Sequence, residues 1–555
     1  MMRTLIFGVT ILLLSGCAGQ RVPEGGPIDT TPPEIISVYP APNTVNYTEK
    51  KIILEFSEYV DRASVQRSIF ISPAIPNVEF DWSSTEVELD FTEDLKPQTT
   101  YVVTVGTDVK DVRQGNKMTN AFSLAFSTGE KIDKGIIRGK VFDDKPDGVM
   151  IFSYRINDIE PDTLNPTHTR PGYITQTGKD GSFTLTNLAN GIYRLFAIRD
   201  TYGNLLYDPE ADDAGTTADV ELSDVDTVRS HVQFILAKED TTAPRIQSVG
   251  TADNRHVTVN FSEPVISVSR ASFVIADTID GTPLPVTSLF PANDALSVFT
   301  LVTARQQEGA PYMVTVHSIE DHSGHIINPL ADRKSFPGSG VNDTLPPAIA
   351  SLSIKDSTTM LLPSDSIQIS FSDAVLCSSD DSLVTIRQQD TGADVPDRVI
   401  WRYPSVCIVR PLAPFTMRQQ YTLTLHWKYV RDESGNGYRD TVSVFHFSTI
   451  DPDLFGSIEG SFAGFGSTFP VIIEGSNIRS KSQKHSFVKV DSAGAFKMDL
   501  LPEGNYVLKA FEDRNGNGID DAGSVFPFRR SEQFRYYPDT IRVRPRWPVD
   551  GVILR

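Results

Sequence analysis

The chain carries an alternating run, Lys51-Ile52-Ile53-Leu54-Glu55-Phe56-Ser57-Glu58, in which every second side chain is apolar until the run ends in an acid. Two later stretches repeat this pattern, namely His256-Val257-Thr258-Val259-Asn260-Phe261-Ser262-Glu263 and Ile367-Gln368-Ile369-Ser370-Phe371-Ser372-Asp373. Alternation with period two places the apolar side chains on the core face of a β-sheet. The sequence therefore predicts three copies of one β-module. The acid at each strand end either bonds loop amides or binds a ligand.

The three copies share further features on both sides of that strand. Each opens with Asp-Thr and a nearby proline, which favours extended chain at a domain boundary: Asp29-Thr30-Thr31-Pro32-Pro33, Asp240-Thr241-Thr242-Ala243-Pro244 and Asp343-Thr344-Leu345-Pro346-Pro347. Each later has a strand that begins with tyrosine, as in the tyrosine corner of sandwich folds: Tyr101–Val105, Tyr312–Val316 and Tyr421–Leu425. An aspartate then opens a turn, and turn chemistry explains it without a metal: Asp111, Asp321 and Asp432.

A second repeat lies between and after these copies, at a constant offset of 313 residues. Its members are Gly181, Phe183, Leu188, Gly191, Tyr193, Leu195, Ala197 and Asp200, which recur as Gly494, Phe496, Leu501, Gly504, Tyr506, Leu508, Ala510 and Asp513. A match without gaps over this span indicates duplication of a whole module. The alternation predicts two strands, with Gly191 making the turn between them.

The first repeat resembles the bacterial Ig-like domain of the SbsA type, which occurs in surface-layer and other cell-envelope proteins. The second, through its Gly-x-Tyr-x-Leu strand, resembles the prealbumin-like or carboxypeptidase-regulatory-like sandwich, and this resemblance brings no catalytic residues. Together they imply an all-β chain of five tandem β-sandwich modules, three Ig-like and two prealbumin-like, after a lipoprotein signal peptide. The predicted modules are named A1 (29–130), B1 (135–238), A2 (240–340), A3 (343–450) and B2 (455–555).

Residues 1–16 have the features of a signal peptide, because their apolar run is too short to span a bilayer. The last residues, Leu14-Ser15-Gly16-Cys17, match the bacterial lipobox. They predict cleavage before Cys17 and lipid attachment to it, and the alternative is an ordinary signal peptide with a chance cysteine. Acyl chains on Cys17 would then be the membrane anchor of the chain.

A linker, 17–28, follows the leader. Its end and the first opening motif, Gly25-Gly26-Pro27-Ile28-Asp29-Thr30-Thr31-Pro32-Pro33, look like envelope lipoproteins of the Bacteroidetes type. In that group an acidic stretch after the cysteine is associated with export to the cell surface, and Ala18-Gly19-Gln20-Arg21 lacks it. We therefore expect an outer membrane-anchored lipoprotein, on the periplasmic side or at the cell surface.

Composition and motifs restrict the class of function. The net charge of −20 disfavours nucleic acid as a partner and is compatible with divalent cations. The sequence holds no His-Glu-x-x-His, no Gly-x-Ser-x-Gly and no phosphate-binding loop, so it predicts no enzyme. His317, His322 and His325 surround a turn, where exposed loop imidazoles are favoured over a metal site.

One loop has coordination potential, namely Asp513-Arg514-Asn515-Gly516-Asn517-Gly518-Ile519-Asp520-Asp521. Oxygen side chains at positions 1, 3 and 5 and a glycine at position 6 match the front half of an EF-hand loop. Position 12 is Ser524, so Asp520 or Asp521 must replace the usual acid. The candidate Ca²⁺ ligands are Asp513, Asn515, Asn517, Ile519 and Asp521, and the alternative is a polar Asn-Gly turn. The B1 counterpart, Asp200–Asp208, is the weaker candidate.

Cysteine and tryptophan leave two more questions open. Cys377 and Cys407 lie in one module, where they form either a disulfide or two buried thiols. The four tryptophans could stack on glycan at loop tips: Trp82, Trp401, Trp427 and Trp547. The matching positions of Trp82 and Trp401, each before the Tyr strand, favour core packing instead.

The sequence thus predicts a non-catalytic envelope protein whose modules serve as structural spacers, for adhesion or as a scaffold, with protein or glycan partners. A glycan-binding lipoprotein of a nutrient-uptake system is the alternative, and it is favoured by exposed tryptophan or tyrosine side chains clustered on the loops of one module. A hydrolase with unrecognised acids is a third interpretation, and it requires a deep cleft that holds two carboxylates.

Overall fold

The computed structural model describes residues 29–75, 77–156, 163–292, 294–354, 360–377, 382–439, 441–466, 469–478 and 485–555. The signal peptide, Cys17 and the linker lie outside the described residues. Strands dominate the described chain, which confirms the predicted all-β class. None of its helices is both long and apolar enough to cross a bilayer. The chain divides into two compact units, Met1–Ala237 with Ala522–Ser531, and Lys238–Asp521 with Glu532–Arg555.

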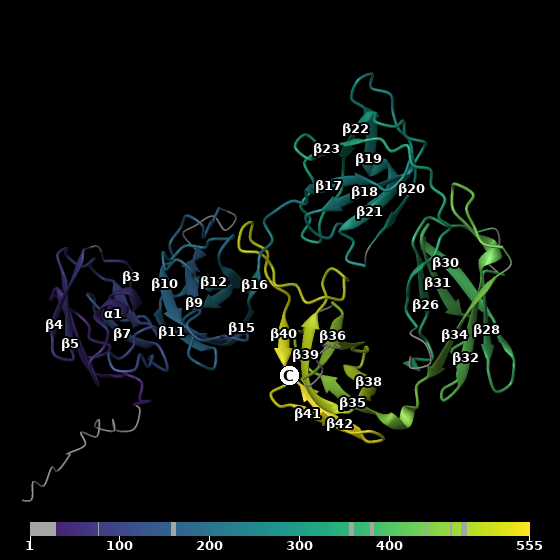
Figure 1. Cartoon of the computed structure of the whole chain (residues 1–555). Coiled ribbons are helices and arrows are strands. Elements are labelled where there is room, and N and C mark those ends of the chain that lie inside the picture. The colour runs from purple at the N-terminus through teal and green to yellow at the C-terminus, as the bar shows by residue number, and fades with distance from the viewer. Residues whose placement is uncertain are drawn as a thin grey trace, which may run out of the picture. The chain divides into compact units, whose positions relative to one another are not determined.

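Segment A1, in the first unit, forms two antiparallel sheets (Figure 1). The first has the order β1 (Ile35–Tyr39), β2 (Lys51–Phe56), β5 (Glu86–Phe91), β4 (Val78–Ser83), and the second β3 (Ile69–Ser72), β6 (Thr100–Val105), β7 (Phe122–Ser127). Burial alternates along β2 as predicted, because its apolar side chains enter the core. The helix α1 (Arg62–Ser68) begins after Asp61, whose carboxylate accepts a hydrogen bond from the Ser64 amide.

Segment B1 has one large and one small sheet. The large sheet has the order β10 (Tyr173–Gln176), β9 (Met150–Arg155), β12 (Gly191–Ile198), β13 (Asp213–Thr216), β16 (Ala237–Lys238), with β14 (Val220–Leu222) also on β12. The small sheet is β11 (Ser182–Leu188), β8 (Gly135–Phe142), β15 (Val228–Ile235), and β15 runs parallel to β8. The two strands predicted on either side of the Gly191 turn are confirmed as β11 and β12. They do not pair as a hairpin, because they lie in different sheets and the turn crosses from one sheet to the other.

In the second unit, segments A2 and A3 repeat the A1 arrangement. In A2 the sheets are β17 (Ile246–Thr251), β18 (His256–Phe261), β21 (Val298–Thr303), β20 (Val286–Pro291), and β19 (Phe273–Asp277), β22 (Pro311–Val316), β23 (Arg333–Pro337). In A3 they are β24 (Ile349–Leu352), β26 (Ile367–Phe371), β31 (Val406–Pro411), β30 (Asp397–Tyr403), then β25 (Met360–Leu361), β34 (Val442–Thr449), β32 (Gln420–His426), β28 (Val384–Gln388), β29 (Asp394–Val395), and the pair β27 (Leu376–Cys377), β33 (Val430–Arg431).

Segment B2 repeats the B1 arrangement. Its small sheet is β38 (Ala495–Pro502), β35 (Phe455–Phe462), β42 (Pro548–Leu554), with β42 parallel to β35. Its large sheet is β37 (His485–Lys489), β36 (Val471–Asn477), β39 (Gly504–Glu512), β40 (Phe534–Tyr536), with β41 (Ile541–Val543) also on β39. The shared parallel pair supports a duplication of the whole module.

Each segment encloses buried apolar side chains of its own, as a sandwich requires. The tyrosine corners are present, because a tyrosine hydroxyl accepts a hydrogen bond from the amide five residues earlier in each A segment. These bonds join Tyr101 to Lys96 (2.8 Å), Tyr312 to Gln307 (3.2 Å) and Tyr421 to Thr416 (2.9 Å). The division into five modules at the boundaries given above remains a prediction.

Candidate functional site

Three acidic side chains from distant parts of the sequence converge in each A segment. They are the opening aspartate, the strand-end acid and the turn aspartate: Asp29, Glu58 and Asp111 in A1, Asp240, Glu263 and Asp321 in A2, and Asp343, Asp373 and Asp432 in A3. In A1 and A2, burial first and then the charges of the other two acids raise the pKa of the glutamate. The three motifs are visible in the sequence, whereas their convergence appears only in the folded chain.

The turn aspartates bond their own loops, as their turn chemistry predicts. Asp111 accepts hydrogen bonds from the amides of Gln114, Gly115 and Asn116 at 2.6, 3.1 and 2.9 Å. Burial acts to raise the pKa of Asp111, but these bonds outweigh it and the pKa is lowered. The Asn116 side chain also donates to the Asp29 carbonyl (3.0 Å), which ties the turn to the opening motif.

The A3 cluster is the most buried of the three. Asp373 and Asp432 are 8% and 2% exposed, and their carboxylate oxygens lie within 4.8 Å of each other and of Asp343. Burial, followed by the charges of Asp343 and Asp373, outweighs the Asn436 hydrogen bonds and raises the pKa of Asp432. The Asp343 Oδ2 atom is buried and accepts no hydrogen bond from the described residues. The cluster therefore holds an excess of negative charge.

A histidine from segment A2 supplies positive charge to this cluster. The His256 Nε2 atom lies 3.0 Å from Asp373 Oδ1, and its Nδ1 atom lies 2.7 Å from Asp253 Oδ2. Burial acts to lower the pKa of His256, but the hydrogen bonds and charges of Asp373 and Asp253 outweigh it and raise the pKa to about 9. His256 is therefore an imidazolium at neutral pH. Its charge-assisted contact with Asp373 joins A2 to A3, and its contact with Asp253 lies within A2.

Apolar and polar contacts continue this A2–A3 seam. Phe290 and Val302 of A2 pack with Ala374 and Tyr403 of A3 in a small apolar cluster. The Thr287 hydroxyl of A2 donates a hydrogen bond to the Glu433 carboxylate of A3 at 2.6 Å. The Arg255 guanidinium of A2 lies 3.9 Å from the same carboxylate. These contacts join A2 to A3 within the second unit.

The A2 cluster brings one predicted histidine to two acids. Ligand atoms of Asp240, Asp321 and His325 lie within 4.8 Å of one another, close enough to hold a metal ion. His325 also contacts Asp321 at 3.1 Å and is partly exposed, so an ion pair on the turn accounts for the same geometry. His317 and His322 are not part of this group.

The predicted Ca²⁺ loop folds its oxygen side chains inward. Asp513 accepts hydrogen bonds from the amides of Gly516 and Gly518, and the Asn515 and Asn517 side chains both donate to Asp521 Oδ2, at 2.7 and 3.4 Å. The Ile519 side chain is 65% exposed, as at the outside of a loop. Asp513, Asn515, Asn517 and Asp521, four of the five predicted ligand residues, thus contact one another or the backbone within the loop. An Asn-Gly turn without an ion makes the same contacts.

The counterpart loop in B1 is built in the same way. Asp200 accepts hydrogen bonds from the amides of Gly203 and Leu205, and the Asn204 side chain donates to Asp208 at 2.8 Å. Tyr202, which replaces the third ligand, is 69% exposed. The hydrogen bonds that both loops make are those of the turn. The B2 loop differs in its third position, where it has the oxygen side chain of Asn515 and B1 has Tyr202.

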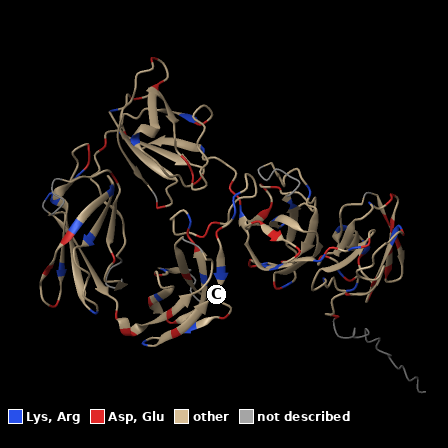
Figure 2. Cartoon of the chain, turned by 180° about the vertical axis from the view of Figure 1, so that it is seen from behind, with Lys and Arg blue, Asp and Glu red and all other residues tan. Residues whose placement is uncertain are grey.

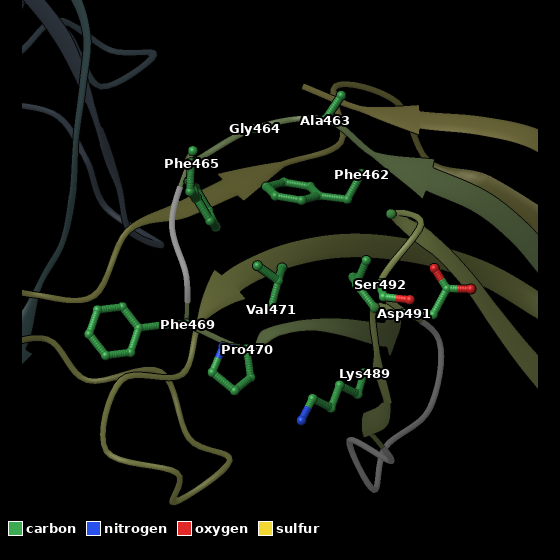
Figure 3. A pocket seen from close by; sticks show the side chains of 13 residues that line it. Phe462, Ala463, Gly464, Phe465, Phe469, Pro470, Val471, Lys489, Asp491 and Ser492 are labelled. Carbon is green, nitrogen blue, oxygen red and sulfur yellow. The ribbon is translucent and has the colours of Figure 1, made fainter.

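An aromatic hollow of about 590 Å³ opens on segment B2 (Figure 3). Phe462, Phe465 and Phe469 line one side of it, and Lys489, Asp491 and Ser492 line the other. The rings of Phe462 and Phe465 are 4.8 Å apart, and the Phe469 side chain is 45% exposed. The sequence patterns did not indicate this site, because the aromatic residues expected to stack on glycan were tryptophan and tyrosine, whereas the hollow is lined by phenylalanines.

The tryptophans and cysteines have mainly structural surroundings. Trp82 and Trp401 pack against the cores of A1 and A3, and Trp427 is buried with its indole N–H bonded to Ser443 at 2.8 Å. Trp547, by contrast, is 70% exposed. Cys407 is buried in the A3 core and Cys377 packs against the same cluster, while a disulfide between them stays a prediction.

Comparison with known proteins supports the fold of segments A1 and A3. The bacterial Ig-like domain family matches residues 29–128 and 343–449. An outer cell wall protein of Brevibacillus brevis is 26% identical over 222 residues, which are 37% of this chain and 19% of that protein, so the chain spans about a fifth of its relative.

Solved structures give weaker likenesses. The N-terminal part of the bacterial S-layer protein SbsC is similar over 50% of this chain and 42% of its own, with 13% identity and a TM-score of 0.17. An L,D-transpeptidase from Mycobacterium smegmatis is similar over 37% of this chain and 90% of its own, with 15% identity and a TM-score of 0.14. The described chain is all-β, it matches the bacterial Ig-like domain family at residues 29–128 and 343–449, and part of it is similar to an outer cell wall protein.

Proposed function

We propose that this chain is a non-catalytic lipoprotein of the cell envelope, whose β-sandwich segments act as spacer and scaffold for adhesion or assembly. The lipobox at Cys17 supports the anchor. The Ig-like match and the outer cell wall relative support a structural role in the envelope. The anchor is in the outer membrane, on its periplasmic side or at the cell surface.

The observation that carries this proposal is the way neighbouring segments are fastened inside each unit. In the first unit, Gln176 of B1 donates to Asp108 of A1 at 2.9 Å, and Thr107 donates to the Thr177 carbonyl at 3.2 Å. In the second, His256 and Asp373 join A2 to A3. Such seams stiffen a chain of sandwiches, and stiffness suits a spacer that holds a binding face away from its anchor.

Asp and Glu residues, red in Figure 2, are spread along the described chain. This distribution favours proteins or glycans of the envelope over nucleic acid as partners. Recovery of partners by the tethered chain from intact envelopes tests the proposal, with the Cys17→Ser chain as the matched untethered control. We expect envelope proteins or glycan to be enriched by the tethered chain. Turnover of an envelope polymer by the purified chain would contradict the non-catalytic role.

A Ca²⁺ ion in the Asp513–Asp521 loop is part of the same proposal. Asp513, Asn515, Asn517 and Asp521 offer oxygens from side chains, and the Ile519 carbonyl offers one from the backbone. A bound ion would stiffen the loop that precedes β40.

Glycan binding is the second candidate function, and the hollow of B2 favours it. The exposed ring of Phe469 offers stacking to a sugar, and the polar side chains of Lys489, Asp491 and Ser492 offer hydrogen bonds. Titration of envelope glycans against the wild type and Phe469→Ala tests this, with the exposed Phe487→Ala as control. Glycan binding that is weakened only by Phe469→Ala supports the second function, and equal binding by all three chains excludes this hollow.

A further inference from the structure

Residues 522–531 are counted with the first unit, whereas the chain before and after them belongs to the second. They form a loop with a closed neck, because the Glu532 amide donates to the Asp521 carbonyl (2.9 Å) and the Asp521 amide donates to the Glu532 side chain (3.3 Å). Such compact surface loops with neighbouring ends are frequently functional.

This loop is an insertion relative to the first copy of the repeat. Phe196 on β12 pairs with Thr216 on β13, and the corresponding pair in B2 is Lys509 on β39 with Tyr536 on β40. Residue numbers differ by 313 between β12 and β39 and by 320 between β13 and β40. B2 therefore has seven additional residues between its two paired strands. The duplicated fold itself does not need these residues.

The inserted loop has its own internal structure. Ser524 and Arg529 exchange two backbone hydrogen bonds of 2.9 Å, and the Ser524 hydroxyl donates to the Pro527 carbonyl at 2.6 Å. Gly523 has φ +74°, and a Cβ atom there would collide with the Thr216 hydroxyl and the Arg529 carbonyl. A loop that is ordered in advance loses little conformational entropy when it binds.

Its apolar side chains pack on segment B1. Val525 is 1% exposed and belongs to the same buried cluster as Phe196 and Tyr207. The Phe528 ring meets Phe196 edge to face at 5.9 Å, and the Arg194 guanidinium lies 3.7 Å from the Phe528 ring centroid. Two hydrogen bonds to Asp219, at 2.9 and 2.8 Å, hold Arg194 in this position.

The polar contacts centre on Thr216, which is 2% exposed. The Ser531 amide donates to the Thr216 hydroxyl (2.8 Å), and the Ser531 hydroxyl donates to the Thr216 carbonyl (2.7 Å). The Thr216 hydroxyl also lies 3.0 Å from the carbonyl oxygens of Ala522 and Arg529. The polar groups at the base of the loop are thus satisfied by the side chain and the backbone carbonyl of one B1 residue, Thr216.

We propose that residues 522–531 are a docking loop for segment B1 of the same chain, seated between Arg194, Phe196 and Thr216. The loop combines a buried apolar residue, an aromatic ring under a fixed guanidinium and a satisfied hydrogen-bond centre. The internal partner is favoured over an external one because Thr216 and Ser531 are paired within one copy.

Disulfide trapping in the full chain tests this proposal. We expect Thr216→Cys with Ser531→Cys to form a disulfide within one chain under mild oxidation, identified by mass after digestion. Val225→Cys with Ser531→Cys is the matched control, because Val225 is an exposed residue of B1 in the same unit. A disulfide that joins two chains would overturn docking in the same copy, and the same yield for both pairs would overturn docking altogether.

Hydrogen exchange gives an independent measure, because it does not require the new cysteines. Phe528→Ala should speed exchange of the Ser531 amide by about tenfold or more, since undocking exposes it. Phe526→Ala, at a 44% exposed ring in the same loop, should change it less than about twofold. Equal exchange in both variants and the wild type would overturn the proposal even if a disulfide forms.

Discussion

The imidazole of His256 on β18 lies 3.0 Å from the carboxylate of Asp373, which follows β26 of the next Ig-like segment. Asp373 is one of the strand-end acids that the sequence pattern singles out. Sequence analysis left open whether such an acid bonds loop amides or binds a ligand. In A3 it does the first, through the Ala374 amide at 2.6 Å, and it also binds a side chain of the preceding segment.

This contact predicts a pH-dependent stability of the A2–A3 pair. The pKa of His256 is raised from 6.5 to about 9. Its contribution to the free energy of unfolding is therefore complete below pH 6.5 and is lost as the pH rises through about 9. We expect the wild type to lose ~2 kcal/mol over this range relative to His256→Gln, allowing for partial solvent screening. Calorimetry at pH 6 and pH 9.5 measures the difference.

The matched control for that experiment is His322→Gln, which removes an exposed imidazole from the same segment. It should follow the wild type at both pH values. A His256→Gln chain with the same pH dependence as the wild type would show that the charge of His256 does not stabilise the seam.

The tyrosine corners predict a second stability effect. Tyr421→Phe removes the oxygen that accepts the Thr416 amide hydrogen bond, so it should lower the free energy of unfolding of A3 by about 1 to 2 kcal/mol. Tyr59→Phe, at a 60% exposed ring in A1, is the control and should have almost no effect. Denaturant unfolding of both variants checks this, and equal stability would mean that the corner is not a stabilising contact.

The proposed Ca²⁺ loop predicts a ligand effect that its counterpart should not show. If the ion binds, Ca²⁺ at a hundred times its Kd raises the free energy of unfolding by about 2.7 kcal/mol. Asp513→Asn should remove this gain, while Asp200→Asn in the homologous B1 loop should leave it unchanged. Thermal unfolding with Ca²⁺ and with a chelator measures it. If neither Ca²⁺ nor the chelator changes the thermal unfolding of the wild type, the loop is a polar turn that does not bind Ca²⁺.

The parts of the fold that depend on local pattern could be predicted from the sequence. The alternation of Ile52, Leu54 and Phe56 defines β2, and the tyrosines at 101, 312 and 421 mark their corners, because each signal lies within a few residues. The exchange of layers between β11 and β12 could not be predicted in this way. A short glycine turn looks alike whether the chain stays in one sheet or crosses to the other.

The sites were harder to predict because their parts lie far apart in the sequence. Asp343 and Asp432 come together only when the opening strand meets the turn after β32. The apolar residues Val525 and Phe528 can be seen in the sequence. The residues that their loop contacts, Phe196 and Thr216, lie about 300 residues earlier in segment B1. Pairing across such distances is a property of the folded chain, and one sequence holds no direct record of it.

The central claim is that this chain is a lipid-anchored, non-catalytic β-sandwich protein of the envelope. Fatty-acid labelling of cells that express the wild type or Cys17→Ser, followed by separation of membranes, tests it most directly. We predict that the wild type is labelled and recovered with the outer membrane, while Cys17→Ser is unlabelled and released. A wild type that carries no label, or a Cys17→Ser chain that stays in the membrane, would contradict the claim.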